Sequence, residues 1–347
     1  MALLAIDSFD FYATADLSKR GWNLVGTVSI TTSNARRGNA LSTQFGSGAT
    51  ARRVVSTSGV STIYAGFAFY VASSTSVSMG GTGCGIFSLV EGTTQHLTIG
   101  VDSSQRVGVM RGGSTGTVLG SSAIGVVPVA VSSYIEIGAT IHDTTGTVTI
   151  KVNGTSVLTL TGQDTRNGLT GVIQSVQFGS NNVACYFDDL YVCDSSGSAP
   201  NNTFLGDVRV DAVFPDGDGN YTEWTPSTGT THYTLVDETT PNTSDYNSSG
   251  TSGQRDTYAF AALPSVVGTP TVYGVAVNAA CLKDDAGAVN NWRAMVRSSS
   301  TDANGATSFA PSTSQEIQQT IFETDPNGSI AWTQTSVNAA EFGVNIT

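Results

Sequence analysis

Residues 183–192, VACYFDDLYV, organise the first half of the chain. Apolar and aromatic residues occupy both sides of its alternation, and a period of two is typical of a β-strand. Because both faces carry large apolar groups, we expect this strand to lie between two packed layers. Asp188 and Asp189 interrupt it, and a buried carboxylate requires N–H partners or a cation. We expect backbone N–H groups or a covering loop to supply them.

The composition favours strands over helices. The chain has 347 residues, enough for two domains, and only 12% of them are charged, whereas it contains 39 glycines. Runs of helix-forming residues with 3.6-residue spacing are nearly absent, and Thr and Val recur in alternating patterns. We therefore predict an all-β protein. The net charge of −12 argues against a nucleic-acid partner, because binding to phosphates requires clustered Lys or Arg.

Short alternating runs separated by turns indicate a two-sheet sandwich in the first half. The best hairpin signal joins 146–152 to 156–161 through Asn153 and Gly154, since Asn-Gly adopts positive φ at little cost. A polar run follows residue 193. We therefore expect a first domain at 1–195, a linker at 196–203 and a smaller β-domain at 204–347.

Several of these runs resemble the concanavalin A-like jelly rolls of lectins and glucanases, including LamG-type domains. The runs that carry the resemblance are DSFDF at 7–11, YAGFAFYV at 64–71, YIEIGATI at 134–141, the hairpin around Asn153-Gly154, and FDDLYV at 187–192. The resemblance covers about 1–195. It implies an N-terminal jelly-roll sandwich of two curved antiparallel sheets, whose first and last strands are neighbours. This fold serves glycosidases, lectins and inert spacers alike.

The acids of this half do not predict catalysis. Glucanases of the class place two or three carboxylates on alternating positions of one strand, whereas residues 134–141 offer only Glu136. Asp188 and Asp189 are adjacent, so we expect them to point to opposite faces. We therefore expect no enzymatic activity. Hydrogen-bonded structural roles are expected for the three histidines, His96, His142 and His232.

The second half opens with 204–214, FLGDVRVDAVF, whose alternation predicts a strand. Asp216, Asp218 and Asn220 follow at alternate positions with glycines between them, which is the spacing of the first ligands of a calcium loop. No acid occupies the twelfth position, and Asp-Gly pairs also form ordinary Asx-type turns, so we favour the turn over calcium. We expect no other cofactor.

Near the C-terminus we expect a single helical turn over 337–342, with Ser336 as its N-cap and Gly343 at its end.

Phrases in the second half are similar to the carboxy-terminal half of structural proteins encoded by tailed bacteriophages. They are the run 204–214, PDGDGNYTEWTPS, THYTLVDETTPN, DTYAF and DPNGSIAWTQTSVNAAEFGV, and the resemblance covers about 183–347. It implies a non-enzymatic virion component, tail- or fibre-associated, that contacts other virion proteins. A homo-oligomer is also expected. The N-terminal MALLAIDSFDFY lacks a basic region, so we expect no signal peptide, no membrane insertion, and production in a host cytoplasm for incorporation into the virion.

Two other functions stay open: a glycan-binding adhesin that recognises a host receptor, or a head-surface decoration protein. In an adhesin, exposed aromatic rings would stack on sugars. The candidate rings are Trp22, Tyr221, Trp224 and Tyr246. Packing in the core or in loops is the competing role for each of them.

Overall fold

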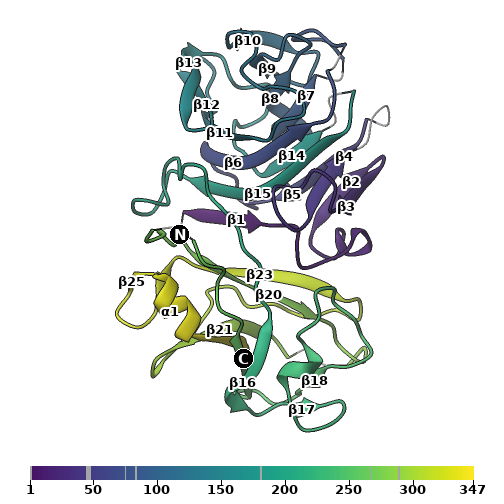
Figure 1. Cartoon of the computed structure of the whole chain (residues 1–347), viewed down its shortest axis with the longest axis vertical. Coiled ribbons are helices and arrows are strands. Elements are labelled where there is room, and N and C mark those ends of the chain that lie inside the picture. The colour runs from purple at the N-terminus through teal and green to yellow at the C-terminus, as the bar shows by residue number, and fades with distance from the viewer. Residues whose placement is uncertain are drawn as a thin grey trace. The chain divides into compact units, whose positions relative to one another are not determined.

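The computed structural model describes residues 2–43, 48–74, 76–82, 84–179, 182–266, 268–287 and 290–347. Within these ranges nearly all regular structure is β, so the predicted all-β fold class is confirmed. The chain divides into two compact units, Met1–Val210 and Asp211–Thr347 (Figure 1). The division lies beyond the linker that the sequence suggested at 196–203. No helix in the described ranges has the length and apolar character needed to cross a membrane.

The first unit contains two antiparallel sheets. The strands of the first sheet are β1 (Leu3–Asp7), β3 (Val28–Thr31), β4 (Ala40–Thr43), β6 (Thr62–Val71), β11 (Ser133–Thr140), β12 (Gly146–Val152), β13 (Thr155–Gln163) and β15 (Cys185–Asp194). Their order is β13-β12-β11-β6-β15-β4-β3, with β1 also paired to β15. The first and last strands are therefore neighbours, as the jelly-roll resemblance implied.

The second sheet has seven strands in the order β10-β9-β8-β7-β14-β5-β2. They are β2 (Trp22–Val25), β5 (Thr50–Val54), β7 (Gly85–Glu91), β8 (Thr94–Val101), β9 (Val107–Arg111), β10 (Thr117–Ser121) and β14 (Ser175–Gly179).

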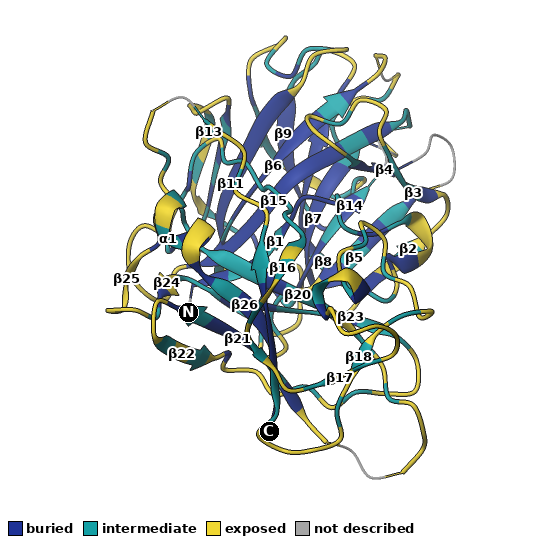
Figure 2. Ribbon diagram, turned by 60° about the horizontal axis from the view of Figure 1, so that its bottom comes forward, coloured by how far each residue is buried: buried dark blue, intermediate teal, exposed yellow. Residues whose placement is uncertain are grey.

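An aromatic core joins the two sheets. Phe67 and Phe187 project from the first sheet and meet Phe87 and Phe178 of the second, with ring centroids 5.0 Å apart for Phe67–Phe87 and 4.3 Å for Phe178–Phe187. All four rings are fully buried, and Figure 2 shows the central strands of both sheets in the buried colour. Offset and tilted ring pairs of this kind stabilise a core beyond their buried area. The prediction that β15 is a buried central strand is confirmed.

Residues 204–214 form no strand, which corrects the prediction from their alternation. The Phe204 ring packs edge-on against Tyr64 at 5.1 Å between centroids. The backbone N–H of Leu205 donates to the Tyr191 hydroxyl, and that of Gly206 donates to Glu136. Since these donors bind side chains, they make no ladder with a neighbouring strand. The backbone at Leu205 and Gly206 is therefore attached to the first sheet through side chains.

The second unit has a five-stranded sheet with two-stranded pairs beside it. The five are β16 (Pro215–Thr222), β19 (Arg255–Phe260), β26 (Glu341–Ile346), β21 (Trp292–Ser298) and β22 (Thr301–Asn304), in that order. The pairs are β17 (Thr225–Pro226) with β18 (Asn247–Ser248), β20 (Val275–Cys281) with β23 (Glu316–Phe322), and β24 (Thr324–Asp325) with β25 (Ile330–Ala331).

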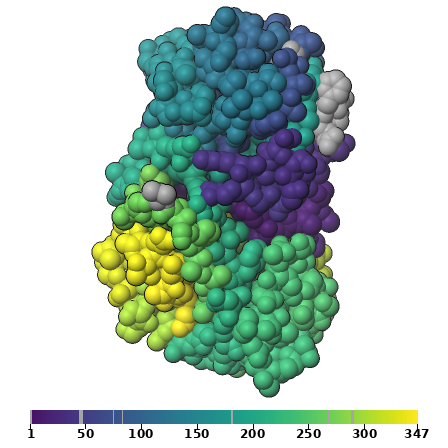
Figure 3. All heavy atoms as spheres, viewed as in Figure 1, coloured from purple at the N-terminus to yellow at the C-terminus, as the bar shows by residue number. Residues whose placement is uncertain are grey.

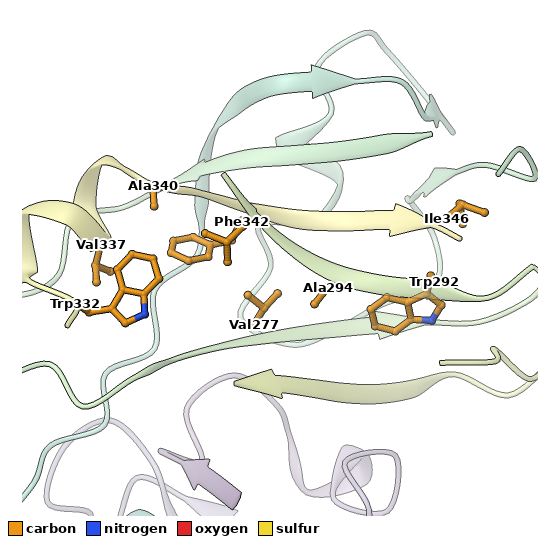
Figure 4. Close-up of a cluster of buried hydrophobic side chains, with 9 residues drawn as sticks. Val277, Trp292, Ala294, Trp332, Val337, Ala340, Phe342 and Ile346 are labelled. Atoms are coloured by element: carbon orange, nitrogen blue, oxygen red, sulfur yellow. The ribbon is translucent and has the colours of Figure 1, made fainter. Parts of the chain in front are cut away.

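The core of this unit lies between β20 and the strands β21 and β26. Trp332 and Trp292 stand at opposite ends of the cluster in Figure 4, with Val277 between them. Phe342, on β26, packs against Phe260 at 5.5 Å between ring centroids. A second, smaller hydrophobic core therefore supports this unit.

The C-terminal helix α1 (Gln334–Ala339) begins earlier than the sequence predicted. Its N-cap is Thr333, whose hydroxyl accepts the N–H of Ser336, while Ser336 reciprocally accepts the N–H of Thr333. The predicted N-cap at Ser336 is wrong because that residue closes the capping box from the third helical position. Gly343 lies within β26 and does not end the helix.

Candidate functional site

The two mid-strand acids of β15 are capped by backbone N–H groups, as predicted. Asp188 Oδ2 accepts the N–H groups of Arg36 and Arg37 at 2.9 and 3.1 Å. Asp189 Oδ1 accepts the N–H of Val210 at 2.7 Å, and the Arg36 guanidinium reaches Asp189 Oδ2 at 3.1 Å. These carboxylates therefore fasten surface segments to the sheet.

The prediction that these two acids point to opposite faces is wrong. The register of β15 against β6 shifts between Asp188 and Tyr191, and Asp189 has a φ of 50°. This bulge breaks the alternation, so both carboxylates contact Arg36 from the same side. Burial, and then the Asp189 charge, raise the pKa of Asp188 to about 8.

Glu136, on β11, is a further buried acid of the first sheet. Its Oε1 accepts the Tyr191 hydroxyl at 2.7 Å and the Gly206 N–H at 2.8 Å. Only 1% of the residue is exposed. The acids on this sheet are thus covered by the chain itself, and a polysaccharide in solution could not reach them without displacing residues 204–210.

Two histidines of the first unit serve as hydrogen-bonded anchors. His96 Nε2 contacts Glu91 at 2.9 Å, and its Nδ1 accepts the N–H of Asn167 at 3.1 Å. Burial disfavours the Glu91 charge, but hydrogen bonds from Thr170, His96 and nearby backbone N–H groups outweigh it and lower the pKa of Glu91 to about 2. His142 Nδ1 caps a turn by accepting the N–H groups of residues 144 and 145.

His232 belongs to a buried polar chain in the second unit. Its Nδ1 lies 2.9 and 3.0 Å from the two oxygens of Asp256, and the Tyr258 hydroxyl donates to the same carboxylate at 2.7 Å. The side-chain amide of Asn247 donates to the His232 carbonyl and to Tyr258. Burial raises the pKa of Asp256. Because Asn247 is held in this way, the chain entering β18 has a fixed position.

Three of the four candidate sugar-stacking rings are occupied by packing. Trp22 is 2% exposed and contacts Phe178, so it belongs to the core. Trp224 packs against the second core and donates its indole N–H to the Gln254 carbonyl. The Arg255 guanidinium covers the Tyr221 ring at 3.5 Å from its centroid. Trp22 is therefore buried, and Trp224 and Tyr221 are each partly covered by their neighbours.

The fourth ring, Tyr246, is 52% exposed. Among the aromatic side chains that the structure describes, it is the one classed as exposed. Its backbone is nevertheless fixed: its N–H donates to the Ser227 hydroxyl at 2.9 Å, and its carbonyl accepts the Ser227 N–H at 2.8 Å. The pairing of β17 with β18 begins at the next residue.

Residues 238–247, the Tyr246 loop, are ordered from within by Asn242. Its side-chain oxygen accepts the N–H and hydroxyl of Ser244 at 2.7 and 2.9 Å, and its amide donates to Glu238 Oε1 at 2.7 Å. Burial raises the pKa of Glu238, and the nearby Asp245 charge raises it further. The stretch that contains this loop is drawn in green in Figure 3, where much of it lies at the surface. An exposed ring and two carboxylates therefore share one ordered loop.

The candidate calcium residues do not form a loop. Asp216, Asp218 and Asn220 lie on one exposed face of β16, which pairs with β19. Asp218 Oδ1 accepts the N–H of Tyr233 at 2.7 Å. The predicted turn is wrong because the backbone is extended by strand pairing. Across the described ranges, no group of three or more His, Cys, Asp or Glu residues is placed to hold a metal ion.

Comparison with known proteins gives a likeness of fold only. No family model and no curated protein matches the chain. Among solved structures, alginate lyase Aly36B matches with 15% identity and a TM-score of 0.36, over 55% of this chain and 96% of that one. Alginate lyase vAL-1 from Chlorella virus matches with 14% identity and a TM-score of 0.39, over 53% and 99%. The Emp46p carbohydrate recognition domain matches with 10% identity and a TM-score of 0.31, over 52% and 95%.

These comparisons correct the functional prediction drawn from the second half of the sequence. The matched structures are alginate lyases and carbohydrate recognition domains, so the expectation of a non-enzymatic structural component of a phage virion is wrong. The β-sandwich fold itself is shared by enzymes and lectins, so function has to be argued from the site.

Proposed function

We propose that this chain is a carbohydrate-binding protein whose sugar contact is the Tyr246 loop. The observation that carries the proposal is the Tyr246 ring, which is 52% exposed although its backbone is fixed on both sides. Exposure of a large aromatic ring to water is unfavourable compared with its burial, and the apolar face of a pyranose can cover the ring. Ser227 fixes the backbone from which the ring projects, and the ring would position the sugar.

The polar groups beside the ring suit sugar hydroxyls. Ionised carboxylates accept hydrogen bonds only, and a sugar hydroxyl is a donor that can satisfy them. Glu238 and Asp245 lie within the same loop, close enough for the Asp245 charge to act on Glu238. A ring for stacking and two acceptors for hydroxyls are the minimum that an oriented saccharide requires.

Order in the loop favours affinity. The hydrogen bonds of Asn242 to Glu238 and Ser244 fix the loop before a ligand arrives. A site that is already ordered loses less conformational entropy on binding.

Charge narrows the class of glycan to neutral sugars. The chain carries a net charge of −12, and the proposed site adds Glu238 and Asp245 locally. An acidic polysaccharide would be repelled by both the local and the overall charge. We propose binding without cleavage, because the buried carboxylates of the first sheet are already used by backbone and hydroxyl donors.

The test is a panel of neutral and acidic oligosaccharides, followed by calorimetric titration of the tightest binder. Tyr246→Ala should weaken binding at least about tenfold, which corresponds to about 1.4 kcal/mol. Tyr246→Phe keeps the ring and should stay within about threefold of wild type, since stacking on a sugar uses the ring face and not the hydroxyl. The bound oligosaccharide should be recovered intact.

Ile330→Ala is the matched control, because Ile330 is 58% exposed in the same unit and lies outside the loop. It should leave the affinity unchanged. Failure of every oligosaccharide in the panel to bind would overturn the proposed function. Equal affinity of wild type and Tyr246→Ala would leave glycan binding standing but remove it from this loop.

A further inference from the structure

A cluster of buried charge lies in the first unit where β1, β2 and β5 approach one another. Asp7 is the last residue of β1, Arg53 belongs to β5, and Arg20 precedes β2. All three are buried, at 1%, 7% and 4% exposure. The cluster lies far in the chain from the Tyr246 loop and shares no residue with it.

The single carboxylate of the cluster accepts three hydrogen bonds, none of them from Arg20, with which it forms only a long ion pair. Asp7 Oδ1 accepts the Tyr12 hydroxyl at 3.0 Å and the Phe9 N–H at 3.1 Å. Asp7 Oδ2 accepts Arg53 Nη1 at 3.2 Å, and it lies 3.8 Å from Arg20 Nε. The last distance is too long for a hydrogen bond. Arg20 is therefore near a carboxylate that binds other donors.

Two nitrogens of Arg20 are left over. Arg20 Nε and Nη2 are shielded from solvent and have no hydrogen-bond partner among the described residues. The guanidinium lies 5.6 Å from the Phe11 ring centroid, and that of Arg53 lies 5.9 Å from the Trp22 ring. Aromatic faces attract a cation weakly, but they accept neither of these N–H groups in a normal hydrogen bond.

Within the cluster, two cations face one anion. Leaving a buried charge uncompensated is strongly destabilising, and so is leaving a buried N–H unpaired. Burial, and then the neighbouring Arg20 charge, lower the pKa of Arg53 to about 9. The nearby buried acid Asp16 is already paired with Lys19 at 2.8 Å. The missing element is therefore one negative charge that accepts hydrogen bonds.

We infer that Arg20, together with Arg53, forms a buried binding site for a small monovalent anion of the halide class. The two orphan donors of Arg20 would bind it, and the second guanidinium would balance its charge. A spherical ion needs no fixed acceptor geometry, and the Phe11 and Trp22 rings beside the two guanidinium groups offer no competing acceptor. A water molecule would satisfy the donors but leave the charge.

Thermal unfolding of the full chain tests this inference. Sodium bromide or chloride is substituted for sodium gluconate at constant ionic strength, so that general screening stays fixed. The wild-type Tm should rise with halide in a saturable way, by about 2–4 °C or more at saturation. A Tm that is the same in halide and gluconate would overturn the inference.

Arg20→Met keeps the length and apolar contacts of the side chain and removes both orphan donors. It should abolish the halide dependence. Arg37→Met is the control, since Arg37 is an exposed arginine whose contact to Asp188 uses only its backbone, and it should keep the dependence. Halide dependence that persists in Arg20→Met would place the ion elsewhere and overturn the site.

Should Arg20→Met fail to fold, crystals of the wild-type chain soaked in bromide provide the second measurement. An anomalous peak beside Arg20 Nε and Nη2 is expected. A water molecule at that position without anomalous signal would overturn the inference.

Discussion

The hydroxyl of Tyr191 donates a 2.7 Å hydrogen bond to Oε1 of Glu136. The two residues belong to β15 and β11, the strands on either side of β6 in the first sheet. The same hydroxyl accepts the N–H of Leu205, so one oxygen connects the sheet to the segment that covers it. Burial, and then the Glu136 charge, raise the pKa of Tyr191, which keeps its proton available for this bond.

Tyr191→Phe should therefore destabilise the first unit by about 1–3 kcal/mol, because it removes one of the two donors to Glu136 Oε1 and leaves the Leu205 N–H without its acceptor. Urea unfolding measures the loss. Tyr70→Phe is the matched control: Tyr70 is a half-buried ring on the same sheet, and it contacts Tyr186 through its ring. Equal losses in the two variants would contradict the role given to the Tyr191 hydroxyl.

The raised pKa of Asp188 predicts that the stability of the first unit falls as the pH rises. Its pKa is raised from 3.8 to about 8 in the folded chain, so between these values the folded state binds more protons than the unfolded state. The contribution of this group to stability is complete below about pH 4 and is lost as the pH rises through about 8.

Asp188→Asn should remove that contribution to the slope, so the stability of the variant should fall less steeply than that of wild type from pH 4 to 8. Chemical unfolding at a series of pH values measures both curves. Asp284→Asn, which changes an exposed carboxylate, should give a curve parallel to wild type. Parallel curves for Asp188→Asn would show that Asp188 titrates normally.

Asn242→Ala tests the order of the Tyr246 loop without touching its ring. The substitution removes the acceptor of Ser244 and the donor to Glu238. Affinity for the oligosaccharide identified above should fall about three- to tenfold, because the loop must then be ordered on binding. Faster hydrogen exchange confined to residues 238–247 should accompany the loss. An unchanged affinity would mean that loop order contributes nothing.

Gly343→Ala should destabilise the second unit by about 1–3 kcal/mol, as overpacking does. A Cβ at this position of β26 would collide with the carbonyl oxygen of Asp256 on β19. Gly217→Ala is the comparison, since its Cβ would meet only the Ala259 methyl at an ordinary 3.6 Å. A change of no more than about 0.5 kcal/mol is expected there. Thermal unfolding of both variants decides the matter.

The sequence was a good guide wherever burial dominated. The alternation of β15 predicted a buried strand, and the cost of burying Asp188 predicted that N–H groups would cap it. The bulge could not be predicted, because positive φ at Asp189 depends on the partner strand and not on the residue type alone. For that reason the Asp188 and Asp189 carboxylates do not point to opposite faces, although simple alternation predicts that they would.

The strand predicted at 204–214 is absent for a different reason. Alternation shows that apolar side chains face one way, but it does not say whether the backbone pairs with a strand or with side chains. Here the donors of Leu205 and Gly206 bind Tyr191 and Glu136. Among the candidate rings, the sequence could not separate Tyr246 from Trp22, because only the folded structure shows that Trp22 is buried and Tyr246 is exposed.

The segment that ends the first unit determines where this protein can be divided. Cutting after residue 195, where composition changes, would remove the N–H of Gly206 from Glu136 and the N–H of Val210 from Asp189. Each of these two buried carboxylates would then lose one of its hydrogen-bond donors. A fragment intended to fold alone should therefore retain the chain through residue 210, even though those last residues form no strand.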